Sequence, residues 1–151
     1  MSESEEGQVP PRLWAMDLRG TAVPPLVQVR RWASRTLGEL SDEHLGDVLL
    51  VATELITNAY DHGNGSGEVR MSYTPRPCHV RIEVDDNSAA HPVLLSASTS
   101  PRGRGVFIVN NLARTWGVLD HPAATSKTVW ADICCEGAGR SRCVPAAAQP
   151  N

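Results

Sequence analysis

Hydrophobic residues recur along the first half of the chain at two spacings, which predict a strand and two helices. Residues 13–19 alternate apolar and polar side chains, as a half-buried strand does. Residues 23–37 carry prolines at their start and, behind them, apolar side chains on one helical face. Ser41 offers an N-cap for a second helix, whose apolar stripe continues to the turn sequence HGNGSG at 62–67.

The second half of the chain predicts four more strands and a third helix. Alternating segments at 67–75 and 78–86 favour a hairpin, and 115–121 and 126–135 predict two closing strands. Residues 105–115 predict the helix between these pairs. This order predicts an α+β fold, a two-layer α/β sandwich with about three helices on one face of a mixed, mainly antiparallel sheet.

The remaining segments lack periodicity. Residues 87–102 are long for a loop inside a compact domain, and loops of this length are usually lids, binding loops or disordered segments. Residues 1–12 and 136–151 are polar, contain prolines and are predicted to be disordered tails. The sequence therefore predicts one domain over residues 13–135.

Composition restricts the class of protein. The 151 residues are 41% hydrophobic and 21% charged with a net charge of −3, which is typical of a soluble domain and disfavours direct nucleic-acid binding. No apolar run approaches the roughly 20 residues of a membrane span, and the acidic start MSESEEGQVPPR is unlike a signal or transit peptide. We therefore expect a cytoplasmic protein. Its cysteines lack C-x-x-C spacing and are expected to be free thiols; they are Cys78, Cys134, Cys135 and Cys143.

Several polar residues stand out from this pattern. Glu54 and Asn58 are four residues apart on the second predicted helix, so their side chains are neighbours that point away from its apolar stripe. Asp85 and Asp86 end a predicted strand, where a carboxylate suits a turn or could hold one donor such as the exocyclic amine of adenine. Thr128, inside the last predicted strand, needs no functional explanation by itself.

The sequence SPRGRG at 100–105 leads into the third predicted helix. A helix amino terminus has unpaired N–H groups and a partial positive charge that suit phosphate, and the glycines allow close approach of the backbone. Arg102 and Arg104 add positive charge. Taken alone, this stretch is more typical of an ordinary loop before a helix than of a phosphate site.

Taken together and in order, these residues resemble the ATP-binding boxes of the GHKL superfamily, or Bergerat fold, which includes gyrase B and the histidine kinases. ELITNAYDHG at 54–63 resembles its N-box, Asp86 the aspartate of its first glycine box, and GRGVFIV at 103–109 its second glycine box. The short form with a late KTVW strand is most similar to the bacterial anti-sigma-factor serine kinases and related stand-alone ATPases.

The resemblance implies a role for each residue. Asn58 would bind Mg²⁺ through its side-chain oxygen, and Glu54 would orient or deprotonate the attacking hydroxyl. Asp86 would accept a hydrogen bond from the adenine amine, with Thr128 beside it. The other implied nucleotide contacts are His62, for which a structural role at a lid hinge is as good an interpretation, and Gly103, Arg104, Gly105 and Val106.

Two questions stay open at this point. The first glycine box usually reads Asp-x-Gly-x-Gly, whereas residues 86–90 read DNSAA, so catalytic turnover does not follow from the resemblance. Asp85 is a second candidate for the adenine contact. We prefer Asp86, on the reasoning that Val84 and Asp86 face the core together only where the strand ends.

The resemblance implies an ATP- and Mg²⁺-dependent protein serine kinase. Such a protein would be a homodimer that holds a sigma factor and phosphorylates a serine on an anti-anti-sigma protein, without direct contact to nucleic acid or membrane. The alternative is a nucleotide-sensing binding module without catalysis, in which ATP orders residues 87–102 and changes the affinity for a partner. Glu54 favours the kinase, and the missing glycines favour the module.

Overall fold

The fold contains five strands and two long helices in the part of the chain that the structure describes. The structure is a computed structural model and describes residues 11–62, 65–75, 78–88 and 108–134. The elements in chain order are β1 (Arg12–Asp17), α1 (Leu26–Thr36), α2 (Asp42–His62), β2 (Ser66–Pro75), β3 (Cys78–Asp86), β4 (Thr115–His121), the 3₁₀ turn η3 (Pro122–Ala124) and β5 (Ser126–Cys134). Residues 108–112 are also helical.

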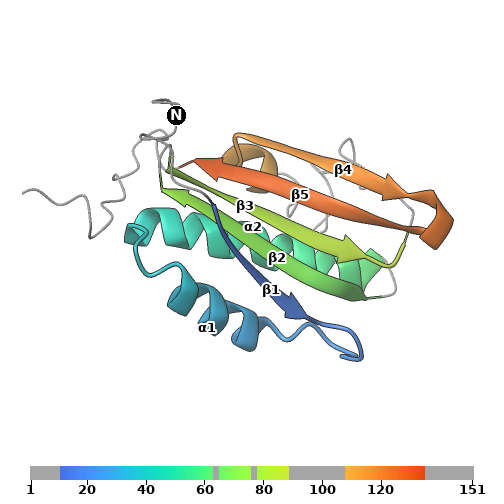
Figure 1. The fold of residues 1–151 in the computed structure, drawn as a ribbon. Helices are drawn as coiled ribbons and strands as arrows, with labels where there is room; N and C mark the ends of the chain where they lie inside the picture. Colours follow the sequence, from blue (N-terminus) through green and yellow to red (C-terminus); the bar gives the residue numbers. More distant parts are fainter. Residues whose placement is uncertain (1–10, 63–64, 76–77, 89–107, 135–151) are drawn as a thin grey trace, which may run out of the picture.

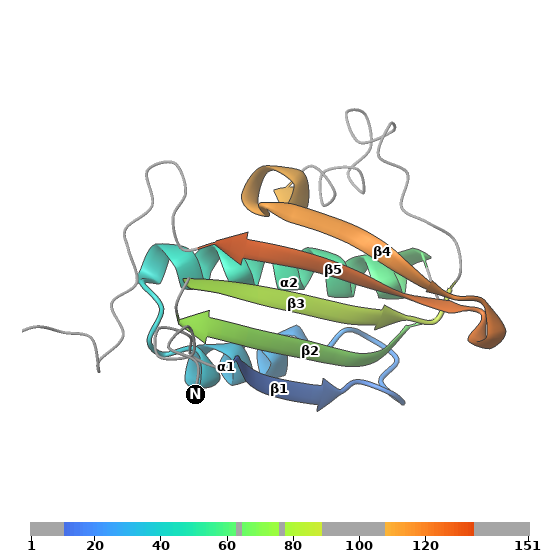
Figure 2. The ribbon, with the colours of Figure 1, turned by 45° about the horizontal axis from the view of Figure 1, so that its top comes forward.

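The strands form one sheet in the order β1-β2-β3-β5-β4. Each pair of neighbours among the described strands is antiparallel. Both α1 and α2 lie on the same face of this sheet (Figures 1 and 2), and Val109 of the helical residues 108–112 belongs to the same core. The predicted α+β sandwich with a mainly antiparallel sheet is therefore confirmed.

Helix α2 begins where the sequence predicts. The side-chain oxygen of Ser41 accepts a hydrogen bond from the backbone N–H of His44 at 3.1 Å, which is the geometry of an N-cap. Asp42 and Glu43 lie in the first turn, where negative charge interacts favourably with the helix dipole. The buried hydrophobic residues of this helix are Val48, Val51, Ala52, Leu55, Ile56 and Ala59.

The core forms because alternate residues of the three central strands point toward the helices. Burying one side chain of the size of valine, isoleucine or methionine contributes about 1.5–3 kcal/mol to the free energy of folding. The buried hydrophobic residues of β2, β3 and β5 are Val69, Met71, Tyr73, Val80, Ile82, Val84, Val129, Ala131 and Ile133. The residues between them point to the opposite face, which the two helices leave uncovered and which we call the outer face.

Strand β1 ends two residues before the predicted strand at 13–19 does. The Asp17 carboxylate accepts a hydrogen bond from the backbone N–H of Arg19 at 2.9 Å, which closes a local turn. Gly20 follows with φ +87°, a conformation that favours glycine. The turn therefore replaces the last part of the predicted strand.

The third predicted helix, 105–115, also ends early. Its described part is helical only as far as Leu112. The backbone N–H of Arg114 donates to the carbonyl of Asp132 at 2.8 Å, so the chain has already joined the sheet at that point. Sheet pairing therefore takes precedence over the helical pattern at residues 113–115.

The predicted tails and loop lie almost wholly outside the described residues. Of the tail at 1–12 only residues 11 and 12 are described, and Arg12 already belongs to β1. Of the loop at 87–102 only residues 87 and 88 are described, and of 136–151 none. Among the described helices, none combines the length and the apolar character of a membrane span.

The end of β3 sends two adjacent carboxylates to opposite faces. Asp86 is 5% exposed and shares the helix-facing side with Val84, whereas Asp85 points to the outer face. Our reasoning that Val84 and Asp86 face the core together only at a strand end was wrong, because residues two apart share a face along any regular strand. This alternation fixes the geometry of the candidate site.

Candidate functional site

Helix α2 carries a polar stripe on its second half. Glu54, Asn58 and Asp61 occupy successive turns, since they follow the i, i+4, i+7 spacing of one helical face. The side chains of Glu54 and Asn58 are half-buried and make no hydrogen bond or ion pair with any other residue that the structure describes. Two partly desolvated polar groups are thus available to a ligand.

The environment of Glu54 changes its acidity. Partial burial raises the pKa of the Glu54 carboxyl above its ordinary value, and the negative charge of Asp61 raises it further. A carboxylate with a raised pKa holds a proton more strongly, which suits a group that has to accept one.

Backbone hydrogen bonds hold the end of α2 against the end of β3. The N–H of Gly65 donates to the carbonyl of Ala59 at 3.2 Å, and the N–H of Asn87 donates to the carbonyl of Gly65 at 3.1 Å. Gly65 has φ +93°, which a residue with a side chain would adopt only with strain. These bonds therefore hold the end of α2, which carries Asn58, and the end of β3, which carries Asp86, at the same end of the sandwich.

Asp86 is held by a buried lysine. The Nζ atom of Lys127 lies 3.2 Å from Oδ2 of Asp86 and donates a hydrogen bond to the carbonyl of Ser88 at 2.8 Å. The other carboxylate oxygen, Oδ1, accepts from the backbone N–H of Ser88 at 2.9 Å. Lys127 is only 3% exposed, so this ion pair lies inside the protein.

The sequence analysis did not single out Lys127, although a signal was present. In the last strand, Lys127 is followed at every second position by Val129, Ala131 and Ile133. The strand pattern therefore places it on the same apolar face as these residues. A charged side chain at such a position requires a partner. It also marks a candidate functional group.

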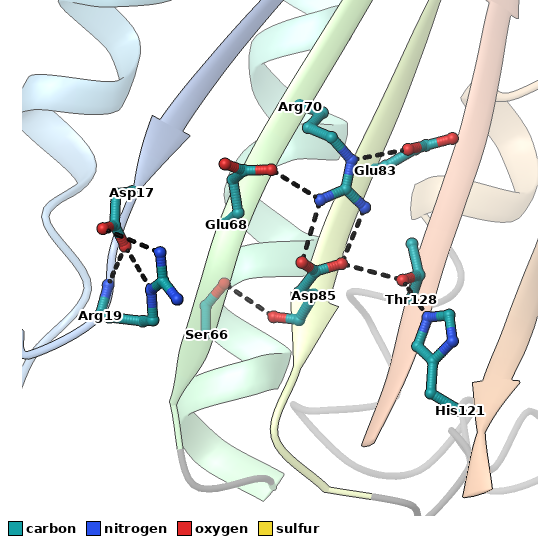
Figure 3. Close-up of polar contacts among 9 residues, drawn as sticks. All are labelled: Asp17, Arg19, Ser66, Glu68, Arg70, Glu83, Asp85, His121 and Thr128. Atoms are coloured by element: carbon teal, nitrogen blue, oxygen red, sulfur yellow. Dashed lines mark hydrogen bonds and ion pairs between the residues drawn. The ribbon is translucent and has the colours of Figure 1, made fainter. Parts of the chain in front are cut away.

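Thr128 does not lie beside Asp86, which corrects our expectation. In the register of β3 and β5, Thr128 lies opposite Asp85 and Lys127 opposite Asp86. The Thr128 hydroxyl donates to Oδ1 of Asp85 at 2.8 Å on the outer face, and Nε2 of His121 lies 2.8 Å from the same hydroxyl (Figure 3). Thr128 lies in the predicted last strand, but beside Asp85 rather than beside Asp86.

Asp85 belongs to a charged network on the outer face. Arg70 donates to both of its carboxylate oxygens, at 2.8 and 2.9 Å, and also to Glu68 and Glu83 (Figure 3). Partial burial by itself would raise the pKa of Asp85, but the hydrogen bonds from Arg70 and Thr128 outweigh it and lower the pKa below its ordinary value. In turn, Asp85 raises the pKa of Arg70.

The comparison with protein families agrees with this geometry. The family model of the histidine kinase-like ATPase domain matches residues 22–131, well over half of the chain. This chain belongs to the histidine kinase-like ATPase domain family. The match confirms the resemblance to the GHKL superfamily that the sequence motifs indicate. A search of curated proteins gives no match.

The described residues of this ATPase domain fit a nucleotide in part. Asn58 offers an amide oxygen to a metal ion, and Mg²⁺ in such sites is held by few protein ligands together with phosphate oxygens. Among the described residues no group of three or more His, Cys, Asp or Glu could hold a metal ion alone. Asp86 offers a buried acceptor to a base, but it already forms an ion pair with Lys127.

Other predicted site residues of the ATPase domain lie outside the described part. His62 is the last residue of α2, and its side chain is not described. Gly103, Arg104, Gly105 and Val106 fall in the undescribed segment 89–107. Cys78 and Cys134 are free thiols, as expected, whereas Cys135 and Cys143 are outside the described residues.

The raised pKa of Glu54 predicts a pH-dependent effect of Glu54→Gln. The neutral form of Glu54 is favoured in the folded protein, so its contribution to stability is fully present below about pH 4 and is lost as the pH rises through the raised pKa. We expect Glu54→Gln to raise the melting temperature at pH 7 and to leave it unchanged near pH 3. Thermal unfolding of both proteins across this range measures the difference.

Asp61→Asn is the companion variant, because Asp61 is the smaller of the two causes of the shift. When Asp61 is replaced by Asn, the melting temperatures at pH 7 of the proteins with glutamate and with glutamine at position 54 should lie closer together but still differ. If the melting temperatures of the wild type and of Glu54→Gln differ by the same amount at pH 3 and pH 7, this would contradict a raised pKa of Glu54.

Proposed function

We propose that this protein binds Mg²⁺-ATP where the end of α2 meets the end of β3, and that it is a protein serine kinase. The observation that carries the proposal is the set of polar groups at this end. Glu54 and Asn58 are half-buried and have no partner among the described residues, and the buried carboxylate of Asp86 lies on the same side of the sheet. The membership of the histidine kinase-like ATPase domain family supports the choice of ATP.

The proposed roles follow from what each group can do. The Asp86 carboxylate accepts a hydrogen bond from the exocyclic amine of the base, which distinguishes adenine from bases that present an acceptor at that position. Asn58 contributes a side-chain oxygen to the metal. When bound, Mg²⁺-ATP supplies the γ-phosphoryl group. Glu54, one turn before Asn58, takes the proton from the attacking serine hydroxyl.

The serine substrate and the partners come from the resemblance of the motifs. We propose that the kinase binds a sigma factor, phosphorylates an anti-anti-sigma protein and acts as a homodimer. Gly103, Arg104, Gly105 and Val106 bind the phosphates through their backbone and charge in this proposal. Four motifs in the expected order, with Glu54 present at the position of the base, support it.

Glu54→Ala tests the catalytic part of the proposal. Loss of a general base lowers phosphoryl transfer by about 10²–10⁴-fold, whereas ATP affinity should change by no more than about twofold, since Glu54 does not contact the base or hold the metal. The measurement is transfer of γ-labelled phosphate to a protein that co-purifies with the full-length chain, with calorimetry for ATP binding.

Glu43→Ala is the matched control, because Glu43 is an exposed carboxylate in the first turn of the same helix. Its transfer rate should equal that of the wild type. Transfer at the wild-type rate by Glu54→Ala would show that Glu54 is not the catalytic base.

A nucleotide-sensing module is the second candidate function. The sequence DNSAA at 86–90, without glycines, and the ion pair that already holds Asp86 both favour binding that is slow or weak over rapid turnover.

Under either function we expect Asn58→Ala to lose most of the gain in ATP affinity that Mg²⁺ provides, measured by calorimetry with and without the metal. ATP binding without transfer to any co-purified protein would favour the module, and no ATP binding by the wild type would reject both functions.

A further inference from the structure

Lys127 holds a position that is unusual for a lysine. It is the only lysine among the fourteen lysine and arginine residues of the chain. It is also 3% exposed, although lysine is almost never fully buried without a partner. Its ammonium lies 3.2 Å from Oδ2 of Asp86 and 2.8 Å from the carbonyl oxygen of Ser88.

The neighbours of Lys127 explain why its side chain turns toward Asp86. β5 sends Val129, Ala131 and Ile133 toward the helices, and Lys127 continues this row at the end of the strand. Asp86 lies directly opposite on β3, on the same face. The two charges therefore meet inside the protein, where an ion pair is screened little by solvent.

The ion pair occupies the group that base recognition requires. Oδ1 of Asp86 accepts from the backbone N–H of Ser88, and Oδ2 faces the ammonium of Lys127. An ammonium at this distance attracts a carboxylate by its full charge, which is little screened inside the protein, whereas an adenine amine is neutral. An adenine amine that reached Asp86 would therefore compete with a cation that belongs to the protein itself.

We propose that Lys127 is an internal competitor for the base-recognition carboxylate: its ammonium holds Asp86 in the nucleotide-free protein and leaves it when adenine binds. The inference rests on the proposed function. The four-carbon stem of lysine allows the ammonium to move by side-chain rotation alone. Lys127 thus determines how tightly the nucleotide binds, separately from the residues that contact it.

Lys127→Met tests the competition, because methionine keeps the length of the side chain and removes the charge. We expect ATP affinity to tighten about tenfold, since a cation no longer competes with the neutral adenine amine for the Asp86 carboxylate. Lys127→Arg keeps a cation and should bind ATP within about threefold of the wild type. Calorimetry at pH 8 measures all three proteins.

The results separate this inference from the proposed function. Equal or weaker ATP binding by folded Lys127→Met would overturn the competition and leave the proposed function intact. No ATP binding by the wild type and by Lys127→Met would overturn both. The double variant Asp86→Asn/Lys127→Met removes both charges and should fold, because a neutral pair avoids an unpaired buried charge, and it should lose the tenfold gain.

A second measurement uses the wild-type protein, so it does not depend on the folding of any variant. With ¹³C-labelled lysine, the single lysine gives one ε-methylene signal in an NMR spectrum. We expect ATP and adenosine to shift this signal and tripolyphosphate, which has no base, to leave it in place. An unchanged signal at ATP concentrations that saturate the protein by calorimetry would show that Lys127 stays on Asp86.

Discussion

Strand alternation at the end of β3 places two adjacent carboxylates on opposite faces of the sheet, and each is neutralised by its own cation. Asp85 on the outer face receives two hydrogen bonds from Arg70, and Asp86 on the helix-facing side pairs with Lys127. A shift of one residue in the strand would exchange the two environments. The candidate site depends on this register, because only Asp86 faces the side where α2 presents Glu54 and Asn58.

The same end of the protein departs from the rules that the rest of the fold obeys. Glu54 is half-buried with a raised pKa, and the ion pair of Lys127 and Asp86 lies on the otherwise apolar, helix-facing side of β3 and β5. Each feature is less favourable for stability than an apolar residue of similar size would be. Such departures concentrate where a protein binds or reacts, which agrees with the membership of the histidine kinase-like ATPase domain family.

Spacing of apolar residues predicted most of the fold. β3 has the predicted bounds, Ser41 caps α2, and the order of elements is as expected. Where the sheet and a local pattern compete, as at Arg114, the prediction was wrong, because the competing partner is distant in sequence. Thr128 was expected beside Asp86, which was wrong for the same reason, since only the register between β3 and β5 places Thr128 opposite Asp85 and Lys127 opposite Asp86. The roles of Glu54, Asn58 and Asp86 stay predictions.

The position of the base in a crystal structure with Mg²⁺ and a non-hydrolysable ATP analogue tests the central claim most directly. The account predicts the adenine amine within hydrogen-bond distance of the Asp86 carboxylate, on the helix-facing side, with the metal on the Asn58 oxygen and the Lys127 ammonium displaced. A base bound on the outer face at Asp85, or one bound elsewhere while Lys127 still pairs with Asp86, would contradict it.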